Sequence, residues 1–223
     1  MALLADFASL FMNLSDAEVS RLVRVCDEEN PSSQDMMLLA YCYENGDHVP
    51  LDEARAVEWY RRSAESGDLI AMETLGSCYL AGTGVPKNPS LAVTWLKRSA
   101  KLGNTRAMCG LARYYDDGIH EERDGELAIQ WYRQTLDHGC FLYWDDFASL
   151  LDRERGPLGT LRYFVDAYKS CESSEGKGEY KALIRELLSD THGFDVLLDW
   201  QRSSKGRENW CPRSRPCAPR TSE

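Results

Sequence analysis

A repeat of 36 residues constrains this chain more than any other feature of its sequence. Residues 34–69 match residues 70–105 at 14 of 36 positions without a gap, and a third copy follows at residues 106–141. A period of this size is typical of a solenoid, in which each unit buries its apolar side against the next. We therefore expect a stacked array within the 223 residues.

Each unit reads as two helices. In the second unit, apolar residues recur at helical spacing first at Met72, Leu75 and Tyr79, and again at Ala92 and Trp95. A glycine after the first helix predicts a helix end, and an Asp or Asn before the second predicts an N-cap. These residues are Gly46, Gly82 and Gly118, and Asp52, Asn88 and Asp124. The unit is predicted to be an αα-hairpin.

The loop Gly-Thr-Gly at 82–84 resembles a phosphate-binding loop only superficially. A phosphate loop follows a strand and usually ends in Gly-Lys-Ser or Gly-Lys-Thr, whereas the residues before Gly82 have helical spacing. Gly84 is replaced by His48 and His120 in the other units. We therefore interpret Gly82 as a helix stop and Gly84 as an optional loop glycine.

The segment "AMETLGSCYLAGTGVPKNPSLAVTWLKRSAKLG" resembles the Sel-one-like repeat, a relative of the tetratricopeptide repeat. Units of that family run Ala, Leu-Gly, Tyr, Gly-x-Gly-Val, Ala, Trp, Ala-Ala and Gly. The resemblance is strong at 70–105, good at 34–69 and partial at 106–141, where Leu136 replaces a second-helix alanine. It implies an all-α fold, a right-handed α/α superhelix that mostly binds proteins or peptides, and no shared active site.

The flanking segments read as caps and a weaker repeat. Residues 142–171 keep the rhythm without the signature, and Pro157 opens a second apolar helix. Ser15 and Glu18 form a capping-box pattern before an apolar helix. The predicted organisation is an N-terminal helical cap at 1–33, repeats at 34–69, 70–105 and 106–141, a degenerate fourth repeat at 142–175, C-terminal capping helices at 176–203 and a disordered basic tail at 204–223.

The charge distribution bears on partners. The formal net charge is −10; the tail from Ser204 holds five basic and two acidic residues, which leaves 21 basic and 34 acidic residues in the body. The body at −13 argues against nucleic-acid binding, which requires clustered Lys and Arg. No apolar run is long enough to span a membrane, and the N-terminus has the spacing of an amphipathic helix rather than a signal peptide. A cytoplasmic protein is predicted.

No catalytic, cofactor or metal site is predicted. None of the eight cysteines forms a Cys-x-x-Cys pair, and we expect them to be reduced. The four histidines show no metal-ligand spacing, and the tail motif "CPRSRPC" lacks a second ligand pair. The tryptophans at 59, 95 and 131 recur within an apolar stripe, so we interpret them as core residues.

The predicted functional surface is the concave side, which the first helices line in related arrays. Positions one step beyond the core stripe are expected to face it, and five of these twelve are acidic. A basic or amphipathic peptide would suit such a groove, although the acids would equally serve solubility alone. The candidate residues are Met37, Tyr41, Glu44, Glu73, Ser77, Leu80, Cys109, Arg113, Asp116, Asp145, Ser149 and Asp152.

The leading functional hypothesis is a non-enzymatic interaction scaffold or adaptor, because the strong sequence signal concerns helix stacking. A hydrolase of the cysteine-rich β-lactamase-like type is an alternative that the resemblance brings in. Those relatives carry two cysteines per unit, whereas Cys42 and Cys78 stand alone in theirs. A second alternative is a regulatory or effector protein whose basic tail binds a membrane surface or nucleic acid.

Overall fold

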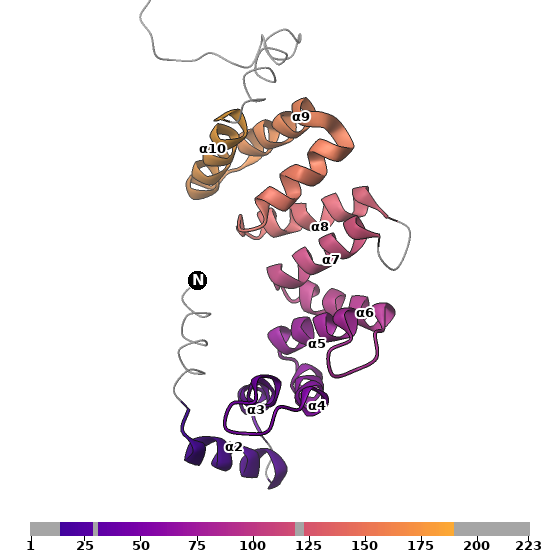
Figure 1. Ribbon diagram of the computed structural model, residues 1–223. Helices are drawn as coiled ribbons and strands as arrows, with labels where there is room; N and C mark the ends of the chain where they lie inside the picture. Colours follow the sequence, from indigo (N-terminus) through magenta and orange to yellow (C-terminus); the bar gives the residue numbers. More distant parts are fainter. Residues whose placement is uncertain (1–13, 29–30, 119–122, 190–223) are drawn as a thin grey trace, which may run out of the picture. The chain divides into compact units, whose positions relative to one another are not determined.

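The computed structural model describes residues 14–28, 31–118 and 123–189, and every regular element in these ranges is helical (Figure 1). The predicted all-α class is therefore confirmed. The predicted C-terminal helix at 194–202 and the basic tail lie outside the described residues. The helices are α2 (Asp16–Glu28), α3 (Ser33–Asn45), α4 (Glu53–Glu65), α5 (Leu69–Ala81), α6 (Pro89–Lys101), α7 (Thr105–Asp117), α8 (Gly125–Asp137), α9 (Trp144–Ser170) and α10 (Ser174–Ser189).

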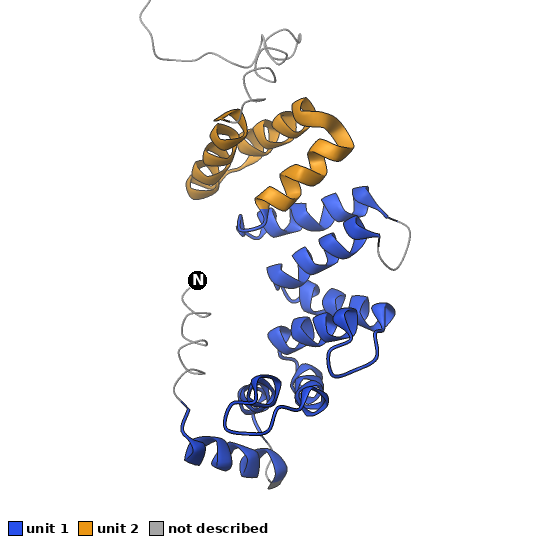
Figure 2. Ribbon diagram, in the orientation of Figure 1, with its two compact units in different colours: residues 1–143 blue, residues 144–223 orange. Residues whose placement is uncertain are grey.

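The chain divides into two compact units, residues 1–143 and 144–223 (Figure 2). In the first unit, α3 pairs with α4, α5 with α6, and α7 with α8. Each second helix also packs on the first helix of the next hairpin, α4 on α5 and α6 on α7. This consecutive stacking is the solenoid arrangement that the 36-residue repeat predicts.

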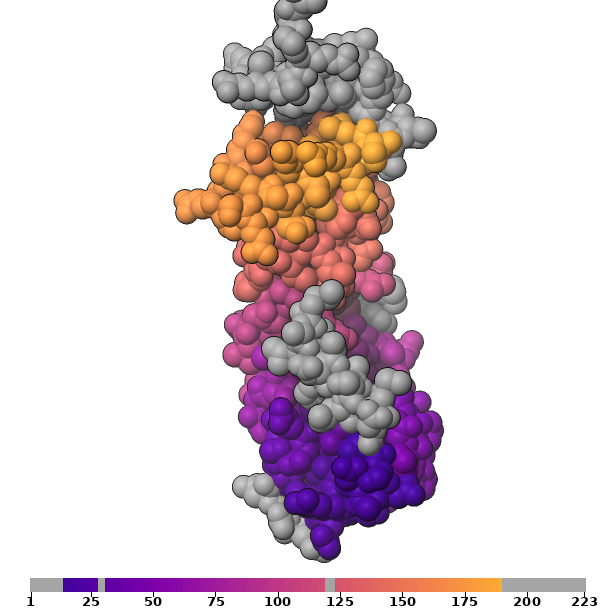
Figure 3. Space-filling model, turned by 90° about the vertical axis from the view of Figure 1, so that its left-hand side faces the viewer, coloured from indigo at the N-terminus to yellow at the C-terminus, as the bar shows by residue number. Residues whose placement is uncertain are grey.

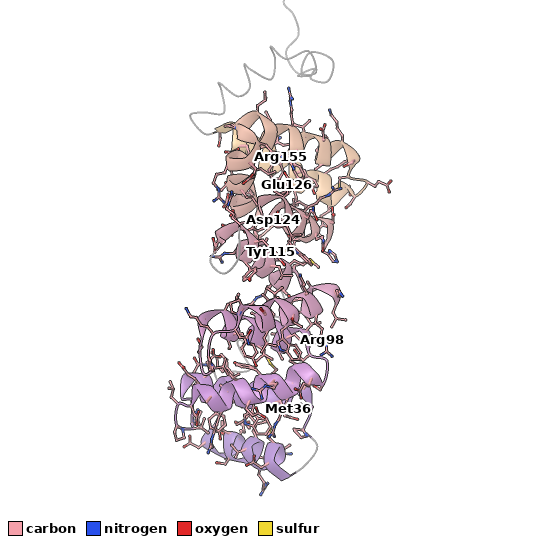
Figure 4. All side chains as sticks on the ribbon, turned by 90° about the vertical axis from the view of Figure 1, so that its right-hand side faces the viewer. Met36, Arg98, Tyr115, Asp124, Glu126 and Arg155 are labelled. Atoms are coloured by element: carbon pink, nitrogen blue, oxygen red, sulfur yellow. The ribbon has the colours of Figure 1, made fainter. Side chains whose placement is uncertain are left out.

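The helix ends follow the predicted local chemistry. The three glycines after the first helices adopt left-handed φ values of 73°, 82° and 60°. The side chains of Asp52, Asn88 and Asp124 accept backbone hydrogen bonds at the starts of α4, α6 and α8. The backbone N–H of Asp124 also donates to the carbonyl oxygen of Tyr115 at 3.0 Å, closing the loop between α7 and α8 (Figure 4).

The structure corrects the interpretation of Gly84 as an optional loop glycine. Its φ is +67°, and a Cβ there would lie 2.3 Å from the carbonyl oxygen of Glu53 in the preceding repeat. His48, at the equivalent position of the first repeat, adopts nearly the same φ of 62° and pairs with Asp16 through its Nδ1. The left-handed backbone is thus shared, and the room beside it decides which residue fits.

The core is a row of repeated positions. Leu39, Leu75 and Leu111 are all at most 1% exposed, as the shared register predicts. The tryptophans are less uniform, because Trp59 is buried whereas Trp95 and Trp131 are half-buried. The guanidinium groups of the arginines three residues later, Arg62 and Arg98, lie over the rings of Trp59 and Trp95, and Figure 4 labels Arg98 on α6. These tryptophans therefore form the outer margin of the core.

The elements at both ends match the sequence pattern locally. The side chain of Glu18 accepts from the backbone N–H of Ser15 at 2.8 Å, which confirms the capping box. In the second unit, α9 is interrupted at Gly156, which has a φ of 71°, and its second half begins at Pro157 as predicted. The description of 142–175 as a degenerate repeat stays a prediction.

Candidate functional site

The first helices of the three repeats present one exposed stripe in the first unit. α3 and α5 lie to the left of α4 and α6 in Figure 1, and Figure 3 shows the molecule from that side. At the four positions that recur along each of these helices, every side chain is exposed or half-exposed. We name this stripe the first-helix face; it comprises Gln34, Leu38, Tyr41 and Asn45 of α3, Ile70, Thr74, Ser77 and Ala81 of α5, and Arg106, Gly110, Arg113 and Asp117 of α7.

Three of the twelve predicted residues fall on each first helix of the first unit, and only the middle one of each three lies on this face. Ser77 and Arg113 are exposed and Tyr41 is half-buried, so these three equivalent positions form its central row. The other predicted residues of these helices are buried or half-buried, because each first helix packs against neighbours on both sides within the stack. The exposed stripe therefore has the same spacing as the predicted one but is turned to one side of it.

The prediction that Met37 and Cys109 lie on the binding surface is wrong. Both were expected to be exposed, but Met37 is 6% and Cys109 3% exposed. Met37 belongs to the same apolar cluster as Leu22 of α2 and Tyr60 of α4. A side chain enclosed in this way contributes to packing and not to a docking surface.

Glu44 is half-buried and already has a partner within the chain. The hydroxyl of Tyr60 donates a hydrogen bond of 2.6 Å to its carboxylate. Burial, together with this bond, raises the pKa of Tyr60 far above its ordinary value, so the phenol stays a donor. Glu44 thus ties α3 to α4.

Glu73 is the single acidic residue of the central repeat, 70–105. Its side chain is 12% exposed, and the Nε of Arg106 in the next repeat lies 3.6 Å from its carboxylate. Burial raises the pKa of Glu73, while the charge of Arg106 opposes this shift. The pair links α5 to α7 and neutralises the carboxylate's charge.

Asp116 is likewise satisfied internally. Its side chain is 12% exposed, and the Nη2 of Arg123 lies 3.1 Å from its carboxylate. The Nε of Arg123 also donates to the Asp116 carbonyl oxygen at 3.0 Å. Leu80, which occupies the equivalent position in α5, is half-buried. The three predicted acids of the first unit therefore serve the fold.

The remaining predicted residues lie in the second unit. Asp145, Ser149 and Asp152 are all exposed on the first half of α9. Their spacing of four and three residues places them on one side of that helix. The structure describes this unit by itself, so their membership of a continuous surface with the first unit stays a prediction.

Sequence reasoning missed part of the first-helix face. The first residues of the face, Gln34, Ile70 and Arg106, were not among the predicted residues. Each precedes other members of the face on its own helix by four and seven residues, so helical spacing alone could have indicated it. Along α3 and α5 the face carries no charged residue, whereas α7 adds Arg106, Arg113 and Asp117. The surface is thus mainly uncharged, with tyrosine and aliphatic contacts at one end.

The described residues contain no group of three or more His, Cys, Asp or Glu side chains arranged to hold a metal ion. The six cysteines within those ranges are not joined in disulfides, and burial raises the pKa of Cys26 and of Cys78 to about 11. The Nδ1 of His138, the C-cap residue of α8, lies 2.9 Å from the carbonyl oxygen of Gln134 in that helix. His120 and His192 lie outside the described residues.

No helix within residues 14–28, 31–118 and 123–189 has the length and apolar character needed to cross a membrane. The cytoplasmic location remains a prediction from the sequence.

Comparison with known proteins identifies the repeat. The profile of the Sel1 repeat matches residues 33–68, 70–104 and 105–140. No curated protein matches the chain. Among solved structures, a Sel1 repeat protein from Oxalobacter formigenes is 22% identical, with a TM-score of 0.61 over 91% of this chain and 83% of that one.

A second solved structure is a protective antigen of uropathogenic Escherichia coli strains that displays an SLR fold. It is also 22% identical, with a TM-score of 0.61, and the match covers 85% of this chain and 41% of that chain. Both likenesses show a shared fold. The three matched repeats bear out the predicted family resemblance, and the solved structures bear out the predicted fold: the chain contains three Sel1 repeats and has an α-solenoid fold.

Proposed function

We propose that this protein is a scaffold that binds an extended or helical segment of another protein along the first-helix face. Sel1 repeat proteins generally serve as protein-interaction scaffolds, and their solenoid is typically non-enzymatic. The proposal places the interaction on α3, α5 and α7 of the first unit.

The observation that best supports the proposal is the contrast in residue type between the buried core rows and the central row of the face. The repeats keep leucine at 39, 75 and 111, all of them buried. In the central row they carry tyrosine, serine and arginine instead: Tyr41 is half-buried, and Ser77 and Arg113 are exposed. A stack that needed only solubility has no use for an aromatic side chain there, whereas tyrosine and arginine are enriched among the residues that dominate binding.

The charges favour an amphipathic partner over a strongly basic one. The enclosed acids Glu73 and Asp116 already pair with Arg106 and Arg123. A basic partner would have to compete with these intramolecular pairs. An amphipathic segment would instead place apolar side chains on the uncharged part of the face at α3 and α5.

Affinity purification with quantitative mass spectrometry tests this function. The full chain is compared with Ser77→Arg, which adds bulk and charge to the centre of the face. Gln130→Arg, at an exposed position of the second helix α8, is the matched control. Proteins retained by the wild type and the control but reduced ~tenfold or more by Ser77→Arg are the expected partners.

An unchanged set of captured proteins with Ser77→Arg, at unchanged thermal stability, would remove the first-helix face as the binding surface. No feature of the described residues specifically supports the two alternatives, a hydrolase or a protein that acts through its basic tail.

A further inference from the structure

A segment of the chain itself has the composition to occupy the first-helix face. Residues 1–13 read "MALLADFASLFMN", and their apolar residues recur at helical spacing with a single charged side chain, Asp6. An amphipathic helix of this kind requires an apolar surface on which to bury its stripe. The apolar residues are Leu3, Leu4, Phe7, Leu10 and Phe11.

The start of α2 determines where this segment joins the first unit. Asp16, in the first turn of α2, pairs with the Nδ1 of His48 in the loop that follows α3. At the other end of α2, Cys26 is close enough to Asp35, in the first turn of α3, for that carboxylate to contribute to its raised pKa after burial. The helix α2 therefore runs antiparallel to α3, and residue 14 lies near the C-terminal end of α3.

The outer surface of α2 does not suit an apolar partner. Val19 and Leu22 are buried against the repeats. Ser20, Arg21 and Arg24 are exposed. Burying two arginine side chains under an apolar helix would cost desolvation free energy without a partner for either charge.

The first-helix face of the first two repeats suits it better, because half of its eight side chains are apolar or aromatic and the other half are polar but uncharged. Tyr41 and Asn45 lie in the C-terminal half of α3, the end near which residue 14 lies, and no position of the face along α3 and α5 is charged. Leu38 and Ile70 are half-buried aliphatic side chains that pack on the margin of the core. The helix α4 packs on both α3 and α5, and packed helices lie roughly 8–10 Å apart, so α3 and α5 lie at most ~20 Å from each other. Thirteen residues in a helix extend ~20 Å, which is enough to reach across both.

We propose that residues 1–13 bind the first-helix face of the first two repeats and compete there with the partner protein. This inference rests on the proposed function, because it concerns regulation of the same face. The segment excludes weak partners, and a partner binds only when its affinity suffices to displace the segment.

A synthetic, fluorescently labelled peptide of residues 1–14 tests the proposal by fluorescence anisotropy. The peptide is added to the full chain, either as the wild type or as a double variant with Phe7→Asp and Phe11→Asp. These two substitutions remove the apolar stripe of the attached segment. We expect the peptide to bind the double variant at least ~tenfold more tightly than the wild type, in which the face is occupied. Adding Ser77→Arg to the double variant should abolish this binding, whereas adding Gln130→Arg should not.

Equal binding to the wild type and the double variant, no binding to either, or binding insensitive to Ser77→Arg would each overturn the proposal. Sedimentation of the wild type as a dimer that the peptide dissociates would also overturn it, since the segment would then cover a second copy. If the peptide fails to bind while Ser77→Arg still loses captured proteins, only the competition is wrong. If the peptide binds as expected but no captured protein depends on Ser77, the proposed scaffold function is wrong instead.

Discussion

Gly84 of the second repeat lies directly against the backbone of Glu53 in the first. The Gly84 N–H donates to the Glu53 carboxylate at 3.2 Å, and an added Cβ would lie 2.3 Å from the Glu53 carbonyl oxygen. The loop after α5 is therefore part of the interface between two repeats. Its tight fit explains why a glycine is required here although a histidine serves in the first repeat.

Gly84→Ala should destabilise the protein by about 3 kcal/mol, from the left-handed backbone and from the clash with Glu53. Gly139→Ala is the matched control, since Gly139 has a similar φ of +73° but no heavy atom within 4 Å of an added Cβ. It should cost only about 1–2 kcal/mol. Urea denaturation followed by circular dichroism measures both changes, and equal losses would contradict the steric account.

Tyr60→Phe should destabilise the protein by about 2 kcal/mol, because it leaves the half-buried Glu44 carboxylate without its 2.6 Å hydrogen bond. The same substitution in a Glu44→Gln background should cost less, since an amide bears no charge to be stabilised. A double-mutant cycle by thermal denaturation gives the coupling between the two side chains. A coupling near zero would show that the hydroxyl contributes nothing through Glu44.

The pH dependence of stability should report the enclosed Glu73. Burial raises its folded pKa, so the carboxylate contributes its full stability below its unfolded pKa and loses it as pH rises through the folded value. The Glu73→Gln variant has no ionisable group at this position, so it does not lose stability in this way as the pH rises. The variant should therefore gain stability relative to the wild type as the pH rises above about 4, the ordinary pKa range of a glutamate.

Unfolding free energies from urea titrations over a range of pH values give the comparison. Arg106→Gln in the wild-type background is informative as well, because removing the opposing charge should enlarge the loss with rising pH. A constant difference between Glu73→Gln and wild type over the whole range would show that the carboxylate titrates as an exposed one does.

Thiol reactivity should separate the cysteines by burial. Cys26, Cys42, Cys78 and Cys109 are buried, whereas Cys140 and Cys171 are half-buried. With a thiol-specific reagent, the four buried thiols should react much more slowly in the native protein, because burial raises the pKa of Cys26 and Cys78 and limits access to them. After unfolding without reductant, all eight cysteines should react; fewer would indicate disulfides and argue against the predicted cytoplasmic location.

Much of the fold follows from features that act locally. Gly82 ends α5 because it adopts a left-handed conformation, and Asn88 caps α6 through its own side chain. Leu39, Leu75 and Leu111 are buried because one helical period repeated every 36 residues places them at equivalent positions. These properties require no knowledge of distant neighbours, and the sequence pattern predicts them correctly.

The candidate site is predictable only in part. Ser77 and Arg113 are exposed and Tyr41 is half-buried, and their role in binding a partner stays a prediction. Met37 and Cys109 were placed beside them by the same helical register and are buried. A comparison of the repeats does not reveal which of the two rows is buried. Residues 37, 73 and 109 differ from one another as much as residues 41, 77 and 113 do.

The sequence by itself determined the helices and their caps, because each depends on residues near in the chain. It also determined the 36-residue stacking period and the buried apolar rows, because the pattern recurs in the sequence itself. Only the tertiary structure decided which margin of each first helix is covered, that Glu73 pairs with Arg106, and that Gly84 has no room for a side chain. These outcomes depend on how closely one repeat approaches the next, and residues about thirty positions apart set that approach.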